Sequence, residues 1–101
     1  MDQITTQNES EYVQARSEDV LDKAKAIVYG PRQAEHGKPI DNHTRTATMW
    51  GAYLGIEITA RDVCMLNILQ KVSRDAHKKG EDNLIDIAGY TLNAELVENW
   101  P

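Results

Sequence analysis

The fold is decided by residues 58–90, ITARDVCMLNILQKVSRDAHKKGEDNLIDIAGY, which hold the most apolar helix pattern of the chain and its densest cluster of ionisable groups. Thr59 and Asp62 have the spacing of a capping box, which predicts that a helix starts at Thr59. The apolar residues that follow cover so much of the helix circumference that we expect it to be buried on several sides, as the central helix of a bundle. These residues are Val63, Cys64, Met65, Leu66, Ile68, Leu69, Val72 and Ala76.

The rest of the chain also has helical periodicity. The predicted helices cover residues 17–28, 41–54, 59–79 and 83–99. Ser17 is the expected N-cap of the first, and Asp41 or Asn42 that of the second. Gly30 is expected to end the first helix in the left-handed conformation, and Gly89 to allow close approach to a neighbouring backbone. With no alternating strand pattern, the sequence predicts an all-α fold, an antiparallel four-helix bundle-like domain.

Length and composition set the organisation of this domain. A chain of 101 residues is expected to form one domain, at residues 17–101, after a polar and partly disordered N-terminal tail at residues 1–16. The chain is 41% hydrophobic and 27% charged, as in ordinary globular proteins. So small a core leaves apolar surface uncovered, and a homo-oligomer, most simply a homodimer, would cover it.

Net charge limits the classes of partner. The formal charge of −5 argues against binding to extended nucleic acid, which needs a basic surface. No apolar run has the length of a membrane span and the N-terminus lacks a signal-peptide pattern, so we expect no membrane partner and a cytoplasmic location. Cys64 is the only cysteine, which leaves no disulfide framework, and we expect it in the core.

The strongest candidate site pairs two cations with two carboxylates. Lys71 and Arg74 share a face of the central helix, and the return of the chain after Gly80 brings Asp82 and Asp86 towards them. In one interpretation the cations bind a phosphorylated ligand while the carboxylates hold a divalent cation such as Mg²⁺. In the other, the four groups form an ion-pair network that fixes the helical hairpin. The sequence leaves both open, because a lysine within so apolar a helix needs some partner.

A second candidate lies where the first helix ends. Tyr29 and Gly30, with Arg32, His36 and Lys38 in the loop after them, could close over a ligand, although a simple helix stop has the same sequence. Tyr90 is expected in the core or at an interface, with stacking on a base as the alternative. His43 is expected to be a buried, hydrogen-bonded histidine rather than a metal ligand.

Several separated motifs resemble those of a small family of bacteriophage and prophage proteins. They are Tyr-Gly at 29–30, TMWGAYLG at 48–55, ITARDV at 58–63, KVSR at 71–74 and DNLIDIAGY at 82–90. The resemblance as a whole covers roughly residues 20–96, and if a phage encodes the protein, the expected location is the host cytoplasm. That family in turn distantly resembles the MazG-type all-α nucleoside triphosphate pyrophosphatases. In those enzymes carboxylates on two helices hold Mg²⁺ beside the triphosphate, and a metal-activated water attacks the phosphate chain.

This resemblance implies only part of a catalytic site. Asp82 and Asp86 match the later acidic motif, with Asn83 where a further carboxylate is expected. The earlier E-E-x-x-E motif has a weak counterpart in Glu18, Asp19 and Asp22. We therefore expect a protein that binds a nucleotide or nucleotide-derived ligand, with Mg²⁺-dependent pyrophosphohydrolysis as a further option. The alternatives are a phage accessory protein that inhibits a host protein, such as a defence component, or a sponge for a nucleotide immune signal.

Overall fold

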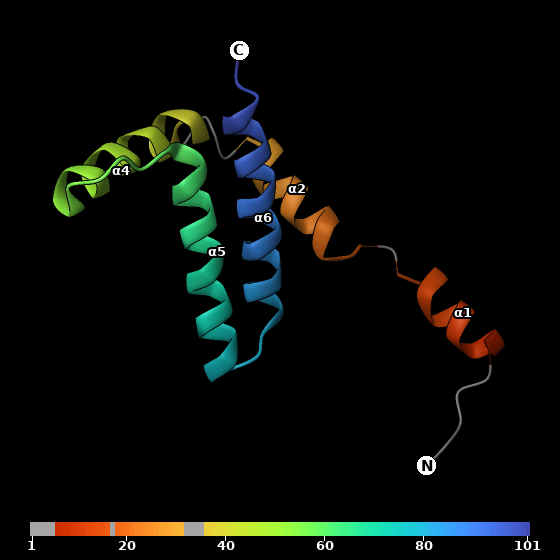
Figure 1. Cartoon of the computed structure of the whole chain (residues 1–101). Coiled ribbons are helices and arrows are strands. Elements are labelled where there is room, and N and C mark those ends of the chain that lie inside the picture. Colours follow the sequence, from red (N-terminus) through yellow and green to blue (C-terminus); the bar gives the residue numbers. More distant parts are fainter. Residues whose placement is uncertain (1–5, 17, 32–35) are drawn as a thin grey trace.

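The protein is all-α, as predicted, and its helices gather around one antiparallel hairpin (Figure 1). The computed structural model describes residues 6–16, 18–31 and 36–101. No strand occurs in these parts of the chain. The helices are α1 (Thr6–Gln14), α2 (Val20–Tyr29), α4 (Pro39–Leu54), α5 (Ala60–His77) and α6 (Glu81–Glu98). The sequence predicts no helix before residue 17, whereas α1 forms there and stands apart from the others (Figure 1).

The hairpin of α5 and α6 is the centre of the fold. α5 begins where the capping box predicts: Thr59 Oγ1 accepts from the Asp62 N–H at 3.0 Å, and the Thr59 N–H donates to Asp62 Oδ2 at 2.9 Å. The hydrogen bond from the Thr59 N–H to the carboxylate is the main cause that lowers the pKa of Asp62. At the other end, Asp75 Oδ1 accepts from the Gly80 N–H and from the Asn83 amide, both at 3.3 Å. Both ends of the hairpin are thus held by side-chain contacts to backbone.

α2 packs along α6, and its start differs from the prediction. Its N-cap is Asp19, whose carboxylate accepts from the Asp22 N–H at 2.9 Å, while Asp22 Oδ2 accepts from the Asp19 N–H at 3.1 Å. Ser17, the predicted cap, lies outside the described residues. Asp19 takes over as cap because its own capping box with Asp22 satisfies two backbone donors at once. Hydrogen bonding, chiefly from the Asp22 N–H, lowers the pKa of Asp19.

α4 also begins earlier than predicted. Its N-cap is Lys38 and Pro39 is its first residue, so the prediction of Asp41 or Asn42 as cap is wrong. Proline suits this position because the first backbone N–H of a helix has no partner to lose and the ring fixes φ near the helical value. Asn42 instead donates its amide to the His36 carbonyl at 2.8 Å, which ties α4 to the segment before it.

Gly30 ends α2, as predicted, but the left-handed conformation predicted for it and the close backbone approach predicted at Gly89 are wrong. Gly55 ends α4 in the left-handed region at φ 71°. Gly30 has φ −84°, which is outside that region. A glycine is nevertheless required at this position, because a Cβ would lie 2.2 Å from the Ala26 carbonyl oxygen. Gly89 does not meet a neighbouring backbone, since a Cβ there would lie 3.7 Å from Val28 Cγ2, an ordinary contact. A larger residue than glycine would therefore also fit between α6 and α2 at this position.

The core is smaller than predicted. Its buried apolar residues, among those described, are Ala24, Val28, Ala47, Val63, Cys64 and Ala94. Cys64 is in the core, as expected, and burial raises the pKa of its thiol to about 11. The prediction that α5 is buried on several sides is wrong for the single chain. Only α6 and α4 pack against it, and they leave Leu69 and Val72 exposed. In the described parts of the chain, no helix combines the length and the apolar character needed to cross a membrane.

Candidate functional site

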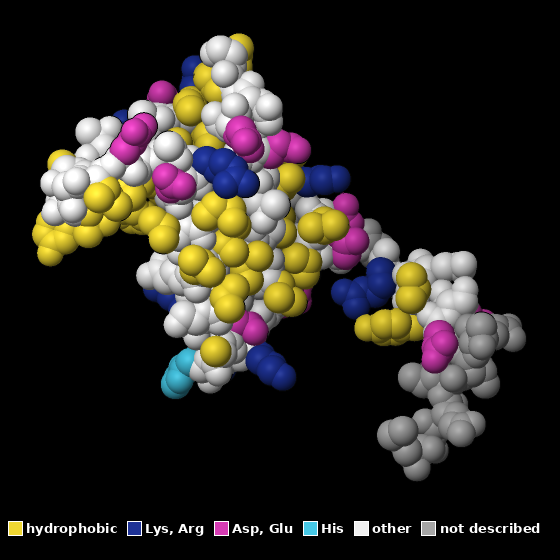
Figure 2. Space-filling model, viewed as in Figure 1, with side chains coloured by type: hydrophobic (Ala, Val, Ile, Leu, Met, Phe, Trp, Pro, Cys, Tyr) yellow, Lys and Arg dark blue, Asp and Glu magenta, His cyan; other side chains and the backbone are white. Residues whose placement is uncertain are grey.

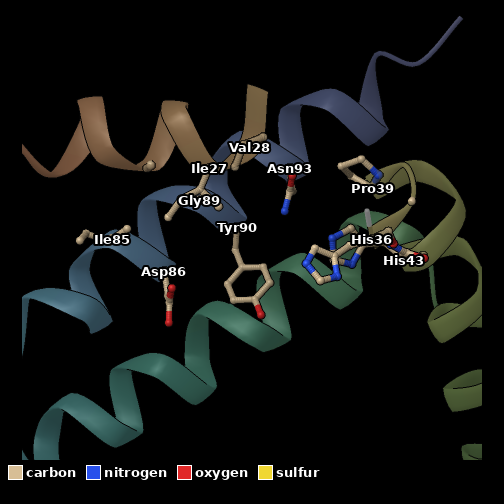
Figure 3. A pocket seen from close by; sticks show the side chains of 13 residues that line it. Ile27, Val28, His36, Pro39, His43, Ile85, Asp86, Gly89, Tyr90 and Asn93 are labelled. Carbon is tan, nitrogen blue, oxygen red and sulfur yellow. The ribbon is translucent and has the colours of Figure 1, made fainter. Parts of the chain in front are cut away.

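A cavity of about 360 Å³ lies between α2, the start of α4 and α6 (Figure 3). Its apolar wall comes from α2 and α6, and its polar groups come from α6 and the segment that leads into α4. This volume falls in the usual range of small-molecule sites, roughly 300–1,000 Å³. The lining residues are Ala24, Ile27, Val28, His36, Gly37, Pro39, Asn42, His43, Ile85, Asp86, Gly89, Tyr90 and Asn93.

One polar group in this lining lacks a partner. The side-chain oxygen of Asn93 is buried and accepts no hydrogen bond. Leaving such a group unsatisfied costs about 1–3 kcal/mol, so native proteins rarely keep one without a reason. In Figure 3 the Asn93 amide lies on the cavity side of α6, between α2 and the His43 end of the cavity. A ligand that donates a hydrogen bond there would satisfy it.

Two rings form the next part of the lining. The rings of His43 and Tyr90 meet edge to face, with centroids 6.3 Å apart and planes at 67°. Burial lowers the pKa of His43, so its imidazole is neutral near pH 7 and offers one donor and one acceptor. His43 faces the cavity, as predicted, but it is half-buried rather than buried. The pair gives the cavity an aromatic face.

Lys71 and Asp86 meet at the margin of the cavity. Lys71 Nζ lies 2.8 Å from Asp86 Oδ2, and the Lys71 side chain is only 16% exposed. The expectation that a lysine on this apolar helix has a partner is therefore confirmed. Because Asp86 also lines the cavity, the pair brings a cation and a carboxylate to the same wall as Tyr90.

The remaining predicted site residues do not join them. Arg74 and Asp82 are exposed and take part in no ion pair found among the described residues. Near Asp82, Glu81 pairs instead with Lys23 of α2, and this contact lowers the pKa of Glu81. Tyr29 and Gly30 lie at the end of α2 and do not line the cavity. Arg32 is outside the described residues.

The carboxylates do not gather into a metal site. In the regions that the structure describes, no three His, Cys, Asp or Glu side chains come close enough together to hold a metal ion. Asp86 is engaged by Lys71, and Asp82, one turn earlier on α6, is exposed. The Mg²⁺ ion that the MazG resemblance implies stays a prediction, because one or two carboxylates together with the phosphates of a ligand can hold it.

Sequence reasoning missed Asn93 and Asn42 as parts of the site. A signal for Asn93 was present, because Asp86, Tyr90 and Asn93 follow the 4-3 spacing of one helix face. Asn42 gave no such signal, since its position depends on the unpredicted start of α4 at Pro39. The site thus combines a face of α6 that the residue spacing predicts with the start of α4, which the residue spacing does not predict.

Comparison with known proteins identifies the family of this chain. Residues 19–97 match the model of a domain of unknown function, DUF6378. The Gene 55 protein of Mycobacterium phage L5 is 41% identical over 81 residues, covering 78% of this chain and 52% of that protein. The Gene 55 protein of Mycobacterium phage D29 is 34% identical over 89 residues, covering 84% of this chain and 57% of that protein.

The chain spans little more than half the length of these curated relatives. No solved structure matches it. The expected kinship with phage proteins is confirmed, while the MazG resemblance receives no support from these comparisons. This chain, a small phage-type helical protein, belongs to the DUF6378 family.

Proposed function

We propose that this protein binds a nucleotide or a nucleotide-derived phosphorylated ligand in the cavity between α2, α4 and α6. The observation that carries the proposal is the buried, unpartnered oxygen of Asn93 in the cavity lining. An asparagine amide offers one acceptor and two donors side by side, which matches the edge of a nucleobase. The proposal is for binding, since no group of three possible metal ligands lies among the described residues.

The other lining groups suit the same kind of ligand. Tyr90 and His43 supply aromatic surface on which a base can stack. Lys71 places a cation beside the wall of the cavity, where it can contact a phosphate while Asp86 holds its side chain in position. The base would then lie towards Asn93 and the phosphate towards Lys71.

The test measures thermal stability with and without ligand for the whole chain and for an Asn93→Leu variant. The probes are nucleoside mono-, di- and triphosphates and cyclic dinucleotides, each added at a fixed protein concentration. Leucine has a similar size and no polar group, so the variant should be at least as stable as the parent without ligand. We expect a nucleotide to raise the Tm of the parent protein and to leave that of Asn93→Leu unchanged.

An asparagine outside the cavity serves as the matched control. Asn99 caps the end of α6, so Asn99→Leu should keep the nucleotide-dependent rise in Tm. Lys71→Ala should reduce the rise most for ligands with more phosphates. The proposal fails if no nucleotide changes the Tm of the parent protein, or if Asn93→Leu and the parent respond equally.

A further inference from the structure

The outward face of α5 has an unusual composition for a helix surface. Every exposed residue between positions 65 and 73 is uncharged, and most are large and apolar. The solvent-facing side of a helix normally carries charged residues. The exposed residues are Met65, Leu66, Leu69, Gln70, Val72 and Ser73. The only charged residue in this stretch, Lys71, is turned inward to Asp86.

Exposed apolar residues continue from this face onto α4. Met49, Tyr53 and Leu54 near the end of α4 are 56–90% exposed, and Ile56 follows them. Figure 2 shows the hydrophobic side chains gathered along the α5–α6 hairpin and, next to it, along α4. Monomeric proteins rarely expose apolar patches larger than a few hundred Å². Such a surface is typical of a face that another molecule covers.

The spacing on α5 favours a second copy as the covering molecule. Met65, Leu69, Val72 and Ala76 are separated by four, three and four residues, the spacing of a knobs-into-holes seam between two helices. A two-fold axis places the same patch on both subunits, so an uncharged stripe meets itself without bringing like charges together. This suits a chain of net charge −5, because contact through an uncharged face adds no like-charge repulsion within the interface.

We propose that two copies of this chain associate through the outward face of α5, with Leu69 near the centre of the interface and the end of α4 at its edge. The interface provides the cover that the single chain lacks on α5. It lies on the side of α5 opposite to Lys71 and the cavity, so the proposal is independent of ligand binding.

The experiment is sedimentation equilibrium of the full chain over a hundredfold range of concentration. We expect a mass of twice 11.4 kDa at the upper end. Because the patch is uncharged, raising the salt from 0.05 M to 1 M should not weaken the association. Leu69→Glu should shift the protein to the monomer mass, with helix content checked by circular dichroism.

Leu21 on α2 supplies the matched control. It is 59% exposed and Leu69 is 62% exposed, but it lies outside the proposed interface. Leu21→Glu should keep the dimer mass. A monomer mass for the parent protein at every concentration overturns the proposal without any variant. It is equally overturned if Leu21→Glu dissociates the dimer and a folded Leu69→Glu does not.

Discussion

Lys71 Nζ of α5 and Asp86 Oδ2 of α6 lie 2.8 Å apart, and the pair links α5 to the part of α6 that lines the cavity. The Lys71 side chain is mostly buried, while the Asp86 side chain is about two-fifths exposed. The pair thus has one shielded and one hydrated partner. Its strength should lie between that of a solvent-exposed and that of a buried ion pair.

A double-mutant cycle measures this strength. Lys71→Met, Asp86→Asn and the double variant should give a coupling free energy of about 1 kcal/mol in urea unfolding at one fixed protein concentration. Arg61 and Glu98 form the control pair, at 3.3 Å with both side chains more than half exposed, and should couple by less than about 0.5 kcal/mol. Equal coupling for the two pairs would show that the shielding of Lys71 has no effect.

The N-cap of α5 should contribute measurably to stability. Thr59→Ala removes the hydroxyl that accepts from the Asp62 N–H, and we expect it to lower the free energy of unfolding by about 1 kcal/mol. Thr48 is the control, because its hydroxyl bonds the Thr44 carbonyl within α4 and caps nothing. Thr48→Ala should change stability by less than about 0.5 kcal/mol. Equal losses would argue against the capping box as the source.

Two glycines within helices should respond to alanine in opposite ways. At Gly89 a Cβ fits at 3.7 Å from Val28, so Gly89→Ala should gain about 0.5–1 kcal/mol through helix propensity. At Gly51 a Cβ would lie 2.8 Å from the Ile56 carbonyl oxygen, so Gly51→Ala should lose about 1–3 kcal/mol. Chemical denaturation of both variants checks the signs. A gain at Gly51 would mean that the turn after α4 shifts freely.

His43 should make stability depend on pH. Its folded-state pKa is lowered by burial, so the unfolded chain binds more protons and stability decreases as the pH falls below about 6.5. Unfolding measured between pH 5 and 8 should show this loss. His43→Gln should flatten the profile in this window, whereas His77→Gln, on an exposed side chain at the end of α5, should not. An unchanged profile in His43→Gln would assign the loss to other groups.

The sequence predicts those structural features that depend on neighbouring residues better than those that depend on distant ones. The Thr59–Asp62 capping box and the all-α pattern need only neighbouring residues, and both are confirmed. The start of α4 was missed because Pro39 was assigned to a loop, although proline is well suited to the first turn. The burial of α5 was overestimated because periodicity shows which residues are apolar and not which molecule covers them.

The site was predicted in part for the same reason. Lys71, Asp86 and Tyr90 come together as the return of the chain after Gly80 suggested. Arg74 and Asp82 do not join them, because each lies one helical turn closer to the turn at Gly80, where both side chains are exposed. The contact between Lys23 and Glu81 joins residues 58 positions apart, and no local pattern predicts it.

Helix α1 has a consequence for how the chain exchanges its amide protons. It is nine residues long and packs along none of the other helices, and isolated helices of this length are marginal in water. Its amides should therefore exchange with deuterium within seconds, while those in the middle of α5 and α6 stay protected for far longer. Any binding event that covers Tyr12 and Val13 would be visible as new protection confined to α1, against a background that starts near zero.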